Sequence, residues 1–561
     1  MASVPFLRFL LPMENPLGFG AGDFVALALA AMLATLLVAR RPIVTFARRI
    51  SERTVVCMAL LAALPIVLRL GLLANHPVPI PTVADDFSYL LLGDTLAHLR
   101  LANAAHHLHR FFEAVFVVQE PSYSSIYPLG QGLALAFGQV VFRLPWAGVL
   151  LSEGLLCAGC YWMLRGWVDP LWALAGGLLA AIEFGPLSPW MNTYWGGAVS
   201  GLAGCLVFGA LPRLRRGVPD KRHRTRDAVL LGIGLGLQLL TRPFEFMVLC
   251  AVVLLFFVPP RALVIGAVAL APAVGLTLVQ NKQVTGSWTQ LPYQLSRDQY
   301  GVPTTFTFQA NPVPHRPLSV EQQVDYDAQV AVHGKDTDTF RTYFERLGER
   351  VRFYRFFFLA PLYFAVAAFL PALRQYRFLV VFAALALLWL ADTFYPYFYP
   401  HYIAAATCLF VLVSVKGLEQ LSRLRVRGFS VGEEAAALIL ILCFGHFVFW
   451  YGSYLAGKGS LPMAMNGNES WDSVNSSSPD ARMDINGRLA RAPGKQLVFV
   501  RYSQAHGASE WIRNAADIDG SRVVWAIDLG AEDDAVLRRY YPDRQAWLLE
   551  PDARPPRLTP F

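Results

Sequence analysis

The chain has 561 residues, of which 55% are hydrophobic and 16% are charged, and its net charge is +8. Soluble domains carry about 25% charged residues, so this composition excludes an ordinary soluble protein and predicts an integral membrane protein. The basic residues form short clusters between apolar segments, where they report membrane orientation rather than nucleic-acid binding. We therefore expect a membrane environment and no nucleic-acid partner.

Apolar windows long enough to cross the ~30 Å hydrocarbon core predict about twelve transmembrane helices. They lie near residues 22–39, 54–74, 146–164, 169–187, 196–212, 227–241, 246–258, 262–280, 353–373, 377–393, 400–417 and 433–452. Another apolar stretch, 130–142, is short for a full crossing. Because the orientation given below requires an odd number of crossings between 131 and 212, we expect 130–142 to be a re-entrant or half-length helix.

Clusters of Lys and Arg in short loops predict the cytoplasmic side. The clusters are Arg40, Arg41, Arg48, Arg49 and Arg53; residues 213–226; Arg374 and Arg377; and Arg423, Arg425 and Arg427. This orientation places the N-terminus, the loops 75–130 and 281–352, and the tail from residue 455 on the extracytoplasmic side.

Three regions follow from these patterns. Residues 1–53 hold an extra N-terminal helix and a basic loop, 54–454 form the transmembrane domain, and 455–561 form a linker and a small α/β domain. In the last region, strands are predicted at 496–502, 521–528 and 544–552, and helices at 507–518 and 531–541. An accessory or acceptor-docking role is expected for this domain. The charged run 338–355 predicts a further helix, along the membrane surface.

Two adjacent carboxylates, Asp85 and Asp86, begin a helix-like segment in the first outer loop. Apolar residues follow at helical spacing, which predicts an amphipathic helix on the membrane surface. Asp85 is a good N-cap residue, and the negative charge of Asp86 interacts favourably with the helix dipole. These two structural roles explain both aspartates without any catalytic or binding function. Capping needs only one carboxylate, however, and a second beside it suits a site that binds a divalent ion or activates a hydroxyl. Residue types alone leave both interpretations open.

Three motifs accompany the acidic pair: SSIYPLGQGLALAFG at 124–138, LTRPFEF at 240–246 and FYPYFYPHYIAAATCLF at 394–410. Over residues 54 to about 420 the chain resembles the GT-C fold glycosyltransferases, and within them the branch of protein O-mannosyltransferases and lipid A aminoarabinose transferases. The resemblance implies transfer of a sugar from a polyprenyl-phosphate carrier on the outer side of the plasma or inner membrane. It also implies that an acidic residue of the first outer loop acts as catalytic base or metal ligand. That role falls on Asp86, with Asp85 beside it.

The chain departs from this family in two places. The acidic pair follows the second predicted span rather than the first, which implies the extra N-terminal helix. At the family's lysine-proline-proline motif the chain reads Ile126, Tyr127 and Pro128, so the lysine that would contact the carrier phosphate is absent. Candidates to replace its charge on the outer side are Arg242, His401, Arg69, and the group His106, His107, His109 and Arg110.

Further residues are candidates for contacts with the sugar or the carrier. The segment EFGPLSPWMNTYWGG at 183–197 interrupts two apolar stretches and supplies Glu183, Asn192, Tyr194 and Trp195. A carboxylate is costly in hydrocarbon unless it faces a polar cavity, which makes Glu183 the second candidate acid. Tyr89, Tyr127 and Tyr402 complete the predicted binding residues. The competing interpretation of these tyrosines and tryptophans is an aromatic belt at the membrane interface.

The predicted function is therefore an inverting transfer of a sugar from a lipid-phosphate donor to an acceptor that is a lipid, a glycan or a protein. Asp85 and Asp86 are possible ligands of a divalent cation, Mg²⁺ or Mn²⁺. The active site and the C-terminal domain are expected outside the cytoplasm. The alternatives are a transporter or flippase of a lipid-linked or anionic solute, and a non-catalytic membrane assembly subunit.

Overall fold

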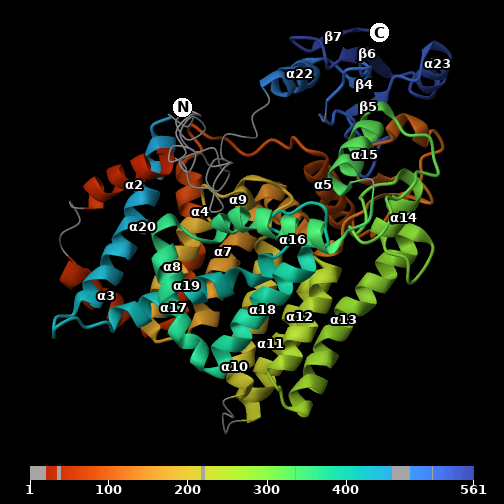
Figure 1. The fold of residues 1–561 in the computed structure, drawn as a ribbon. Helices are drawn as coiled ribbons and strands as arrows, with labels where there is room; N and C mark the ends of the chain where they lie inside the picture. The colour runs from red at the N-terminus through yellow and green to blue at the C-terminus, as the bar shows by residue number, and fades with distance from the viewer. Residues whose placement is uncertain (1–20, 35–39, 216–220, 335, 458–479, 508) are drawn as a thin grey trace.

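The computed structural model describes residues 21–34, 40–215, 221–334, 336–457, 480–507 and 509–561. Helices make up most of this part of the chain, and a small mixed sheet lies near the C-terminus (Figure 1). The predicted combination of a helical membrane protein with a small C-terminal α/β unit agrees with this architecture.

Six helices in the described ranges are long and apolar enough to cross a membrane. They are α4 (Thr54–Gly71), α7 (Pro145–Leu164), α10 (Ala198–Arg215), α13 (Pro260–Thr285), the Ala404–Ser422 helix made of η5 (Ala404–Ala406) and α19 (Thr407–Ser422), and α20 (Val431–Leu455). Each coincides with a predicted span. The protein is therefore an integral membrane protein, as its composition predicts.

The predicted count of about twelve spans exceeds what these helices show, and the difference lies in shorter elements. Apolar helices of 10 to 17 residues occur within α2 (Ala21–Ala34), α6 (Leu129–Phe142), α8 (Pro170–Glu183) and α12 (Pro243–Leu255). At about 1.5 Å per residue, such helices fall short of the ~30 Å hydrocarbon core. α6 is short, as predicted. Two further helices are also not among the six candidate spans. They are α11 (Lys221–Leu239), whose first turns are charged, and α18 (Tyr376–Asp392). Residues 35–39 of the first predicted span lie outside the described ranges.

The predicted span 353–373 is not one straight helix. The helical stretches Phe340–Phe357 and Ala360–Arg374 meet at 113°. They contain α16 (Phe340–Glu349), η2 (Arg350–Phe357), η3 (Ala360–Leu362), α17 (Tyr363–Phe369) and η4 (Leu370–Arg374). The bend falls just before Pro361, which lacks the N–H that would continue the first helix. The helix predicted at 338–355 is confirmed by α16 and η2.

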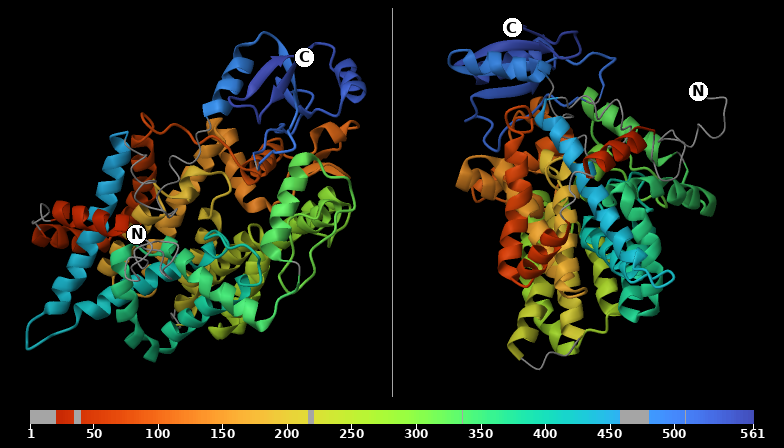
Figure 2. Two further views of the ribbon diagram at one scale, coloured as in Figure 1. Left: turned by 45° about the horizontal axis from the view of Figure 1, so that its top comes forward. Right: turned by 90° about the vertical axis from the view of Figure 1, so that its left-hand side faces the viewer.

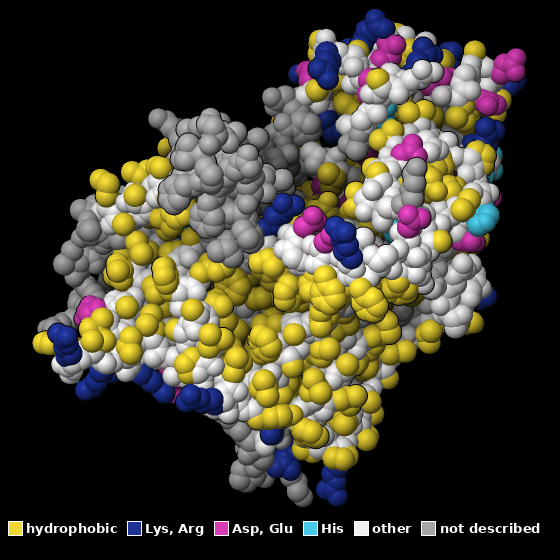
Figure 3. Space-filling model, viewed as in Figure 1, with side chains coloured by type: hydrophobic (Ala, Val, Ile, Leu, Met, Phe, Trp, Pro, Cys, Tyr) yellow, Lys and Arg dark blue, Asp and Glu magenta, His cyan; other side chains and the backbone are white. Residues whose placement is uncertain are grey.

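Hydrophobic side chains form a broad band over the helices on the face shown in Figure 3, with Lys and Arg side chains along its lower rim. The end of α10, the start of α11 and the turn from α12 to α13 lie at this lower end in Figure 1. An apolar band with basic residues at one rim is typical of a membrane protein oriented by its positive loops.

The long loops gather at the opposite end, together with the C-terminal domain (Figures 1 and 2). They carry α5 (Ala84–Ala97), η1 (His109–Phe112), α14 (Pro292–Tyr300) and α15 (Val320–His333), and the strands β1 (Asn103–Ala104), β2 (Val117–Val118) and β3 (Ser122–Ser125). These strands form an antiparallel sheet in the order β1-β3-β2. The remaining short helices are α3 (Arg40–Ser51) and α9 (Pro189–Asn192).

The C-terminal domain contains a four-stranded sheet in the order β5-β4-β6-β7. Its elements are α22 (Asp480–Arg491), β4 (Lys495–Val500), β5 (Val523–Ile527), α23 (Ala531–Tyr540), β6 (Arg544–Glu550) and β7 (Arg557–Pro560). β4 pairs in parallel with β5 and β6, and β7 pairs antiparallel with β6. The three predicted strands and the helix at 531–541 are confirmed. The helix predicted at 507–518 is wrong, because that segment is irregular and buries Trp511, Ile512 and Ala516 against other parts of the molecule.

α5 differs from its prediction in two respects. Val83 is the N-cap residue, and Asp85 and Asp86 both lie inside the first turn. The prediction of an amphipathic helix on the membrane surface is also wrong about exposure. Phe87, Leu91 and Leu92 of α5 are buried in the protein. α6 and the C-terminal domain cover α5 on different sides, which no local pattern indicates.

Candidate functional site

Asp85 is held in place by a pair of stacked tyrosines. Its Oδ1 accepts a hydrogen bond from the Tyr127 hydroxyl. Tyr127 stacks on Tyr89, one turn further along α5, with ring centroids 4.0 Å apart and planes at 10°. Burial raises the pKa of Tyr127 well above its usual value, so the hydroxyl keeps the proton that it donates. As a whole residue, Asp85 remains partly exposed.

Arg242 supplies a positive charge near Asp85. It is the N-cap residue of α12, and its guanidinium carbon lies 4.3 Å from the centroid of the Tyr402 ring. Burial raises the pKa of Asp85, and the Tyr127 hydrogen bond and the charge of Arg242 oppose that rise. Among the residues that the structure describes, no hydrogen bond or ion pair engages the Arg242 guanidinium. Its five N–H donors therefore stay available for a ligand.

The position of Arg242 depends on a close backbone contact at Gly130, near the start of α6. The Gly130 N–H donates to the Leu240 carbonyl. A Cβ at Gly130 would lie 2.3 Å from Thr241 Oγ1 and 2.9 Å from the Leu240 carbonyl oxygen. Only glycine permits this approach. The motifs at 124–138 and 240–246 therefore meet at the site, although they are far apart in the sequence.

Gly130→Ala is expected to lower the free energy of unfolding by about 1–3 kcal/mol, because the added methyl must push the 240–241 backbone away. The same displacement moves Arg242 and weakens binding of a phosphate ligand. Thermal unfolding with and without undecaprenyl phosphate measures both effects. Gly275→Ala is the matched control, since a Cβ at Gly275, inside α13, meets nothing within 4 Å. Equal behaviour of the two variants would contradict the role given to Gly130.

Two further residues come from the second outer loop. The Tyr293 ring, on α14, lies edge-on to Tyr127 with centroids 5.6 Å apart. Asp325, on α15, lies within electrostatic range of Asp85, and burial raises its pKa to about 7 with a further contribution from the Asp85 charge. We call Asp85, Tyr89, Tyr127, Arg242, Tyr293 and Tyr402 the Asp85 cluster.

Asp86 faces a different direction from Asp85 and binds backbone. Its Oδ1 accepts from the Tyr194 N–H at 2.8 Å, and its Oδ2 accepts from the Thr82 N–H at 3.2 Å. The Tyr194 hydroxyl in turn donates to the Pro79 carbonyl at 2.8 Å. Burial raises the pKa of Asp86 to about 7, although the two N–H donors oppose the rise. Asp86 and Tyr194 therefore join α5 to the segment before α10.

Trp195 and His401 lie beside the Asp85 cluster. Their ring centroids are 4.5 Å apart, and His401 lies 4.8 Å from the Tyr402 ring. Burial, with the charge of Arg242, holds the pKa of His401 well below its usual range. The imidazole is therefore neutral and does not provide the missing positive charge.

Asn192 and Arg69 form hydrogen bonds with each other and with backbone carbonyl groups. Arg69 Nε donates to Asn192 Oδ1 at 2.7 Å, and its other nitrogens donate to the carbonyls of His76 and Pro77 at 3.0 and 2.9 Å. The Asn192 amide donates to the carbonyls of Pro186 and Ser188 at 3.0 and 2.8 Å. These contacts fix the turns at residues 76–77 and 186–188.

The other predicted residues lie elsewhere. Glu183, at the end of α8, lines a separate cavity with Leu179, Phe184, Phe357, Leu362, Val411 and Ser414. His106 faces Asp519 of the C-terminal domain at 3.3 Å, and His109 lies 3.6 Å from Glu113 and 3.4 Å from Glu120. The histidine group therefore belongs to a loop contact and not to the Asp85 cluster.

A divalent ion does not fit the acidic pair. Both Asp86 oxygens accept backbone N–H groups, and one Asp85 oxygen accepts the Tyr127 hydroxyl. Magnesium and manganese prefer several oxygen ligands. No group of three or more His, Cys, Asp or Glu side chains suited to a metal occurs in the described part of the chain. These three oxygens of the acidic pair are therefore committed to N–H and O–H donors and not to a metal ion.

The C-terminal domain is joined to the second outer loop by two carboxyl groups that share a hydrogen bond, Glu321 on α15 and Glu510. Glu321 also accepts from the Tyr502 hydroxyl at 2.7 Å, and Glu510 accepts from the Val115 N–H at 3.2 Å. Burial raises the pKa of Glu321 to about 7 and raises that of Glu510 well above its usual value. Both carboxyl groups therefore hold their protons to a higher pH than usual.

Raising the pH through 7 is therefore expected to loosen the docking of the C-terminal domain. Because the folded pKa of Glu321 lies above its ordinary value of 4.5, its stabilising effect is complete below about pH 4.5 and is lost as the pH rises through about 7. Melting temperatures between about pH 5 and 8 measure this loss. Glu321→Gln stays neutral and should flatten the profile, whereas Glu345→Gln, at an exposed position, serves as control. Identical profiles for both variants would contradict the role of the pair.

The chain is similar in structure to several solved proteins. No protein-family model matches the chain, and no curated protein matches it. The structure of ArnT from Cupriavidus metallidurans bound to undecaprenyl phosphate matches with 14% identity over 88% of this chain and 92% of that chain, at a TM-score of 0.49. The apo structure of the same protein matches with 13% identity over the same shares, at a TM-score of 0.47. An oligosaccharyltransferase from Archaeoglobus fulgidus in complex with Zn and sulfate matches with 12% identity over 79% of this chain and 60% of that chain, at a TM-score of 0.46.

All three matches lie below 15% identity and below a TM-score of 0.5. At these scores the likeness does not assign chemistry to any residue. The proposed function therefore rests on contacts within this chain and on the resemblance of its sequence motifs.

Sequence reasoning missed three residues that the structure brings to the site: Tyr293, Asp325 and Arg513. Tyr293 and Asp325 lie in the second outer loop, and Arg513 lies in the C-terminal domain. Each is more than 190 residues from Asp85 in the sequence, and none lies in a recognisable motif. Only the folding of both segments over α5 places them near the acidic pair.

Proposed function

We propose that this protein transfers a sugar from a polyprenyl-phosphate donor to an acceptor hydroxyl. The observation that carries the proposal is the Asp85 cluster, in which the partly exposed Asp85 lies near the Arg242 guanidinium. In the described part of the chain that guanidinium makes no hydrogen bond or ion pair, stacks on Tyr402 and has the buried Glu245 within electrostatic range. Asp85 and Arg242 together provide both charges that the reaction needs. A carboxylate accepts the proton of an attacking hydroxyl, and a guanidinium binds a phosphate through charge-assisted hydrogen bonds.

In the proposed step, the acceptor oxygen attacks the anomeric carbon and the bond from that carbon to the phosphate oxygen breaks. Asp85 takes the hydroxyl proton, and the bonding electrons leave with the polyprenyl phosphate. Arg242 stabilises the negative charge that develops on the phosphate. The Tyr127 hydrogen bond holds the Asp85 carboxylate toward the acceptor. A single displacement of this kind inverts the anomeric centre.

The geometry favours Asp85 over Asp86 as the base, which changes the assignment made from the sequence. Asp86 is buried and accepts two backbone N–H groups, whereas Asp85 is half-buried and lies on the side of Arg242. We propose Asp86 as a positioning residue that fixes the first turn of α5.

The donor class is taken from the sequence resemblance and from the available charge of Arg242. The clustering of basic loops at one end supports an extracytoplasmic location for the site and the C-terminal domain, in the plasma or inner membrane. We propose that α2, α8, α11, α12, α18 and the bent stretch Phe340–Arg374 also cross the membrane, with the bilayer thinned around the shorter helices, which gives about twelve spans together with the six long helices. The proposal includes a lipid, glycan or protein as acceptor.

The proposal is tested by measuring the melting temperature of the purified protein against a panel of polyprenyl-phosphate sugars, followed by a transfer assay with the donor that binds. A ligand that binds only the folded state raises the melting temperature saturably. Binding together with release of polyprenyl phosphate supports a transferase. Binding without release would favour the non-catalytic subunit, and no binding by the folded protein would favour a transporter of another solute.

A further inference from the structure

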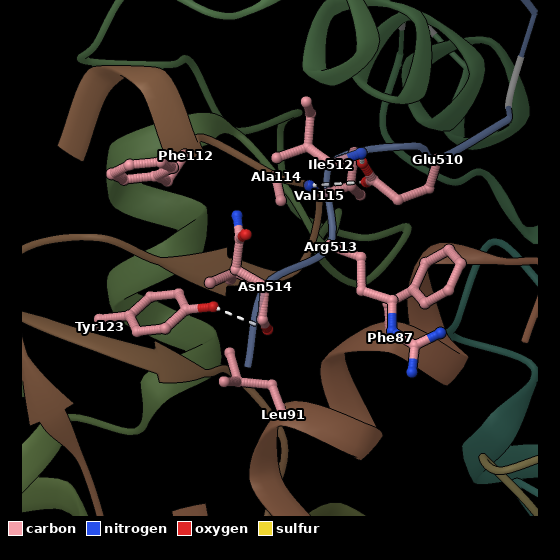
Figure 4. Close-up of a pocket in the computed structure, with 11 residues that line it drawn as sticks. Phe87, Leu91, Phe112, Ala114, Val115, Tyr123, Glu510, Ile512, Arg513 and Asn514 are labelled. Atoms are coloured by element: carbon pink, nitrogen blue, oxygen red, sulfur yellow. Dashed lines mark hydrogen bonds between the residues drawn. The ribbon is translucent and has the colours of Figure 1, made fainter. Parts of the chain in front are cut away.

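Arg513 of the C-terminal domain lies in a segment that is fixed against the first outer loop. On one side, the Val115 N–H donates to Glu510 at 3.2 Å. On the other side, Tyr123 donates to the Asn514 carbonyl at 3.1 Å, and the Ala516 N–H donates to Asp94 at 2.8 Å. Arg513 lies between these contacts (Figure 4). These hydrogen bonds therefore fix the position of the Arg513 backbone.

The Arg513 side chain extends from this segment toward α5, as Figure 4 shows. Its guanidinium carbon lies 5.4 Å from the centroid of the Phe87 ring, and Phe87 directly follows Asp86. Tyr194, Asp86 and Asp94 lie within electrostatic range of it. The side chain is exposed, and no hydrogen bond or ion pair engages its guanidinium within the described ranges of the chain.

A second guanidinium shares the same ring. The Arg482 guanidinium carbon lies 5.0 Å from the Phe87 centroid and 4.3 Å from the Trp511 centroid, and Arg482 donates to the Glu510 carbonyl. Two like charges on one ring repel each other unless an anion lies between or beside them. Asp86 and Asp94 are poor partners for Arg513, because every carboxylate oxygen of both residues already accepts a hydrogen bond. The N–H donors of Arg513 therefore remain for an anion from outside the chain.

The first turn of α5 separates the two available cations. Consecutive helical residues point about 100° apart, so Asp85 and Asp86 face different sides. Arg242 lies on the side of Asp85, at the start of an apolar helix from which a lipid carrier can approach. Arg513 lies on the side of Asp86 and belongs to the domain at the end of the molecule away from the apolar band.

We propose that the C-terminal domain contributes Arg513 to the site as a binding residue for a phosphate or carboxylate group of the acceptor. The inference rests on the function proposed above, because it takes the substrate that enters beside Asp86 to be the acceptor. It gives the C-terminal domain a direct part in substrate choice, since an acceptor with an anionic group is then preferred over a neutral one.

Binding of two probes by the full-length protein tests the inference: inorganic phosphate at constant ionic strength, and undecaprenyl phosphate. Apparent dissociation constants come from the dependence of the melting temperature on ligand concentration. Arg513→Ala should weaken inorganic phosphate binding by at least about 10-fold and change undecaprenyl phosphate binding by less than about 3-fold, since it removes one charged contact from one site only. Arg513→Lys should recover part of the loss, because it keeps the charge without the planar donor set. Arg491→Ala, at an exposed position on α22, is the control for charge removal in the same domain.

Three results would overturn the inference. The first is the absence of saturable phosphate binding by the wild type, and the second is equal phosphate binding by the Arg513→Ala and Arg491→Ala variants. The third is a loss of undecaprenyl phosphate binding in Arg513→Ala as large as in Arg242→Ala, which would place Arg513 at the donor. If the wild type fails to bind undecaprenyl phosphate while phosphate binding still requires Arg513, the proposed function fails and the anion site stands.

Discussion

Asp85→Asn is expected to slow sugar transfer by about 10²–10⁴-fold while the protein still binds its lipid-phosphate donor, because the variant lacks a general base. Asparagine has the shape of aspartate, and its carbonyl oxygen can accept the Tyr127 hydrogen bond that Asp85 accepts. The arrangement of the cluster is therefore kept. Removal of a negative charge near Arg242 also reduces repulsion of the donor phosphate, so donor binding should be unchanged or tighter.

The measurement pairs initial transfer rates at saturating donor with the melting-temperature shift that the donor causes. Asp298→Asn is the matched control, because Asp298 is an exposed carboxylate on α14, outside the Asp85 cluster. It should retain the wild-type rate. A normal transfer rate in Asp85→Asn would remove Asp85 as the base. Loss of donor binding together with transfer would make Asp85 a binding residue instead.

Segments governed by local pattern were predictable from the sequence. A continuous apolar run fixes α4, α7 and α13, because hydrocarbon leaves the backbone little choice other than a helix. The strands β4 and β5 were found for a similar reason, because each is a short, continuous apolar run. The segment 507–518 has helical residue types but is irregular, because burial of Trp511 and Ile512 against the first outer loop outweighs their propensity.

The candidate site divides in the same way. The sequence indicated the acidic pair, Tyr127 and Arg242, since each lies in a motif. The resemblance favoured Asp86 as the base, whereas the proposal here favours Asp85, because the Tyr194 and Thr82 N–H groups both reach Asp86. Those donors depend on long-range packing. The same limit concealed the contribution of the C-terminal domain.

Arg242→Ala is expected to weaken donor binding and to lower the transfer rate by about 10²–10³-fold, since the variant loses the charge that stabilises the departing phosphate. The wild-type guanidinium lies over the Tyr402 ring and near Asp85, so its removal leaves the Asp85 charge without a nearby counter-ion. A phosphate that enters such a site meets repulsion in place of attraction. Both the ground state and the transition state are therefore affected, in contrast to Asp85→Asn.

Arg242→Lys separates charge from geometry. A lysine keeps the positive charge but has no planar fork for two phosphate oxygens, so it should restore donor binding more than it restores the rate. Arg261→Ala is the control, because Arg261 is exposed at the opposite end of the molecule, at the start of α13. Undiminished binding and transfer in Arg242→Ala would show that the phosphate is held elsewhere, and Arg513 would then be the first cation to test as the donor contact.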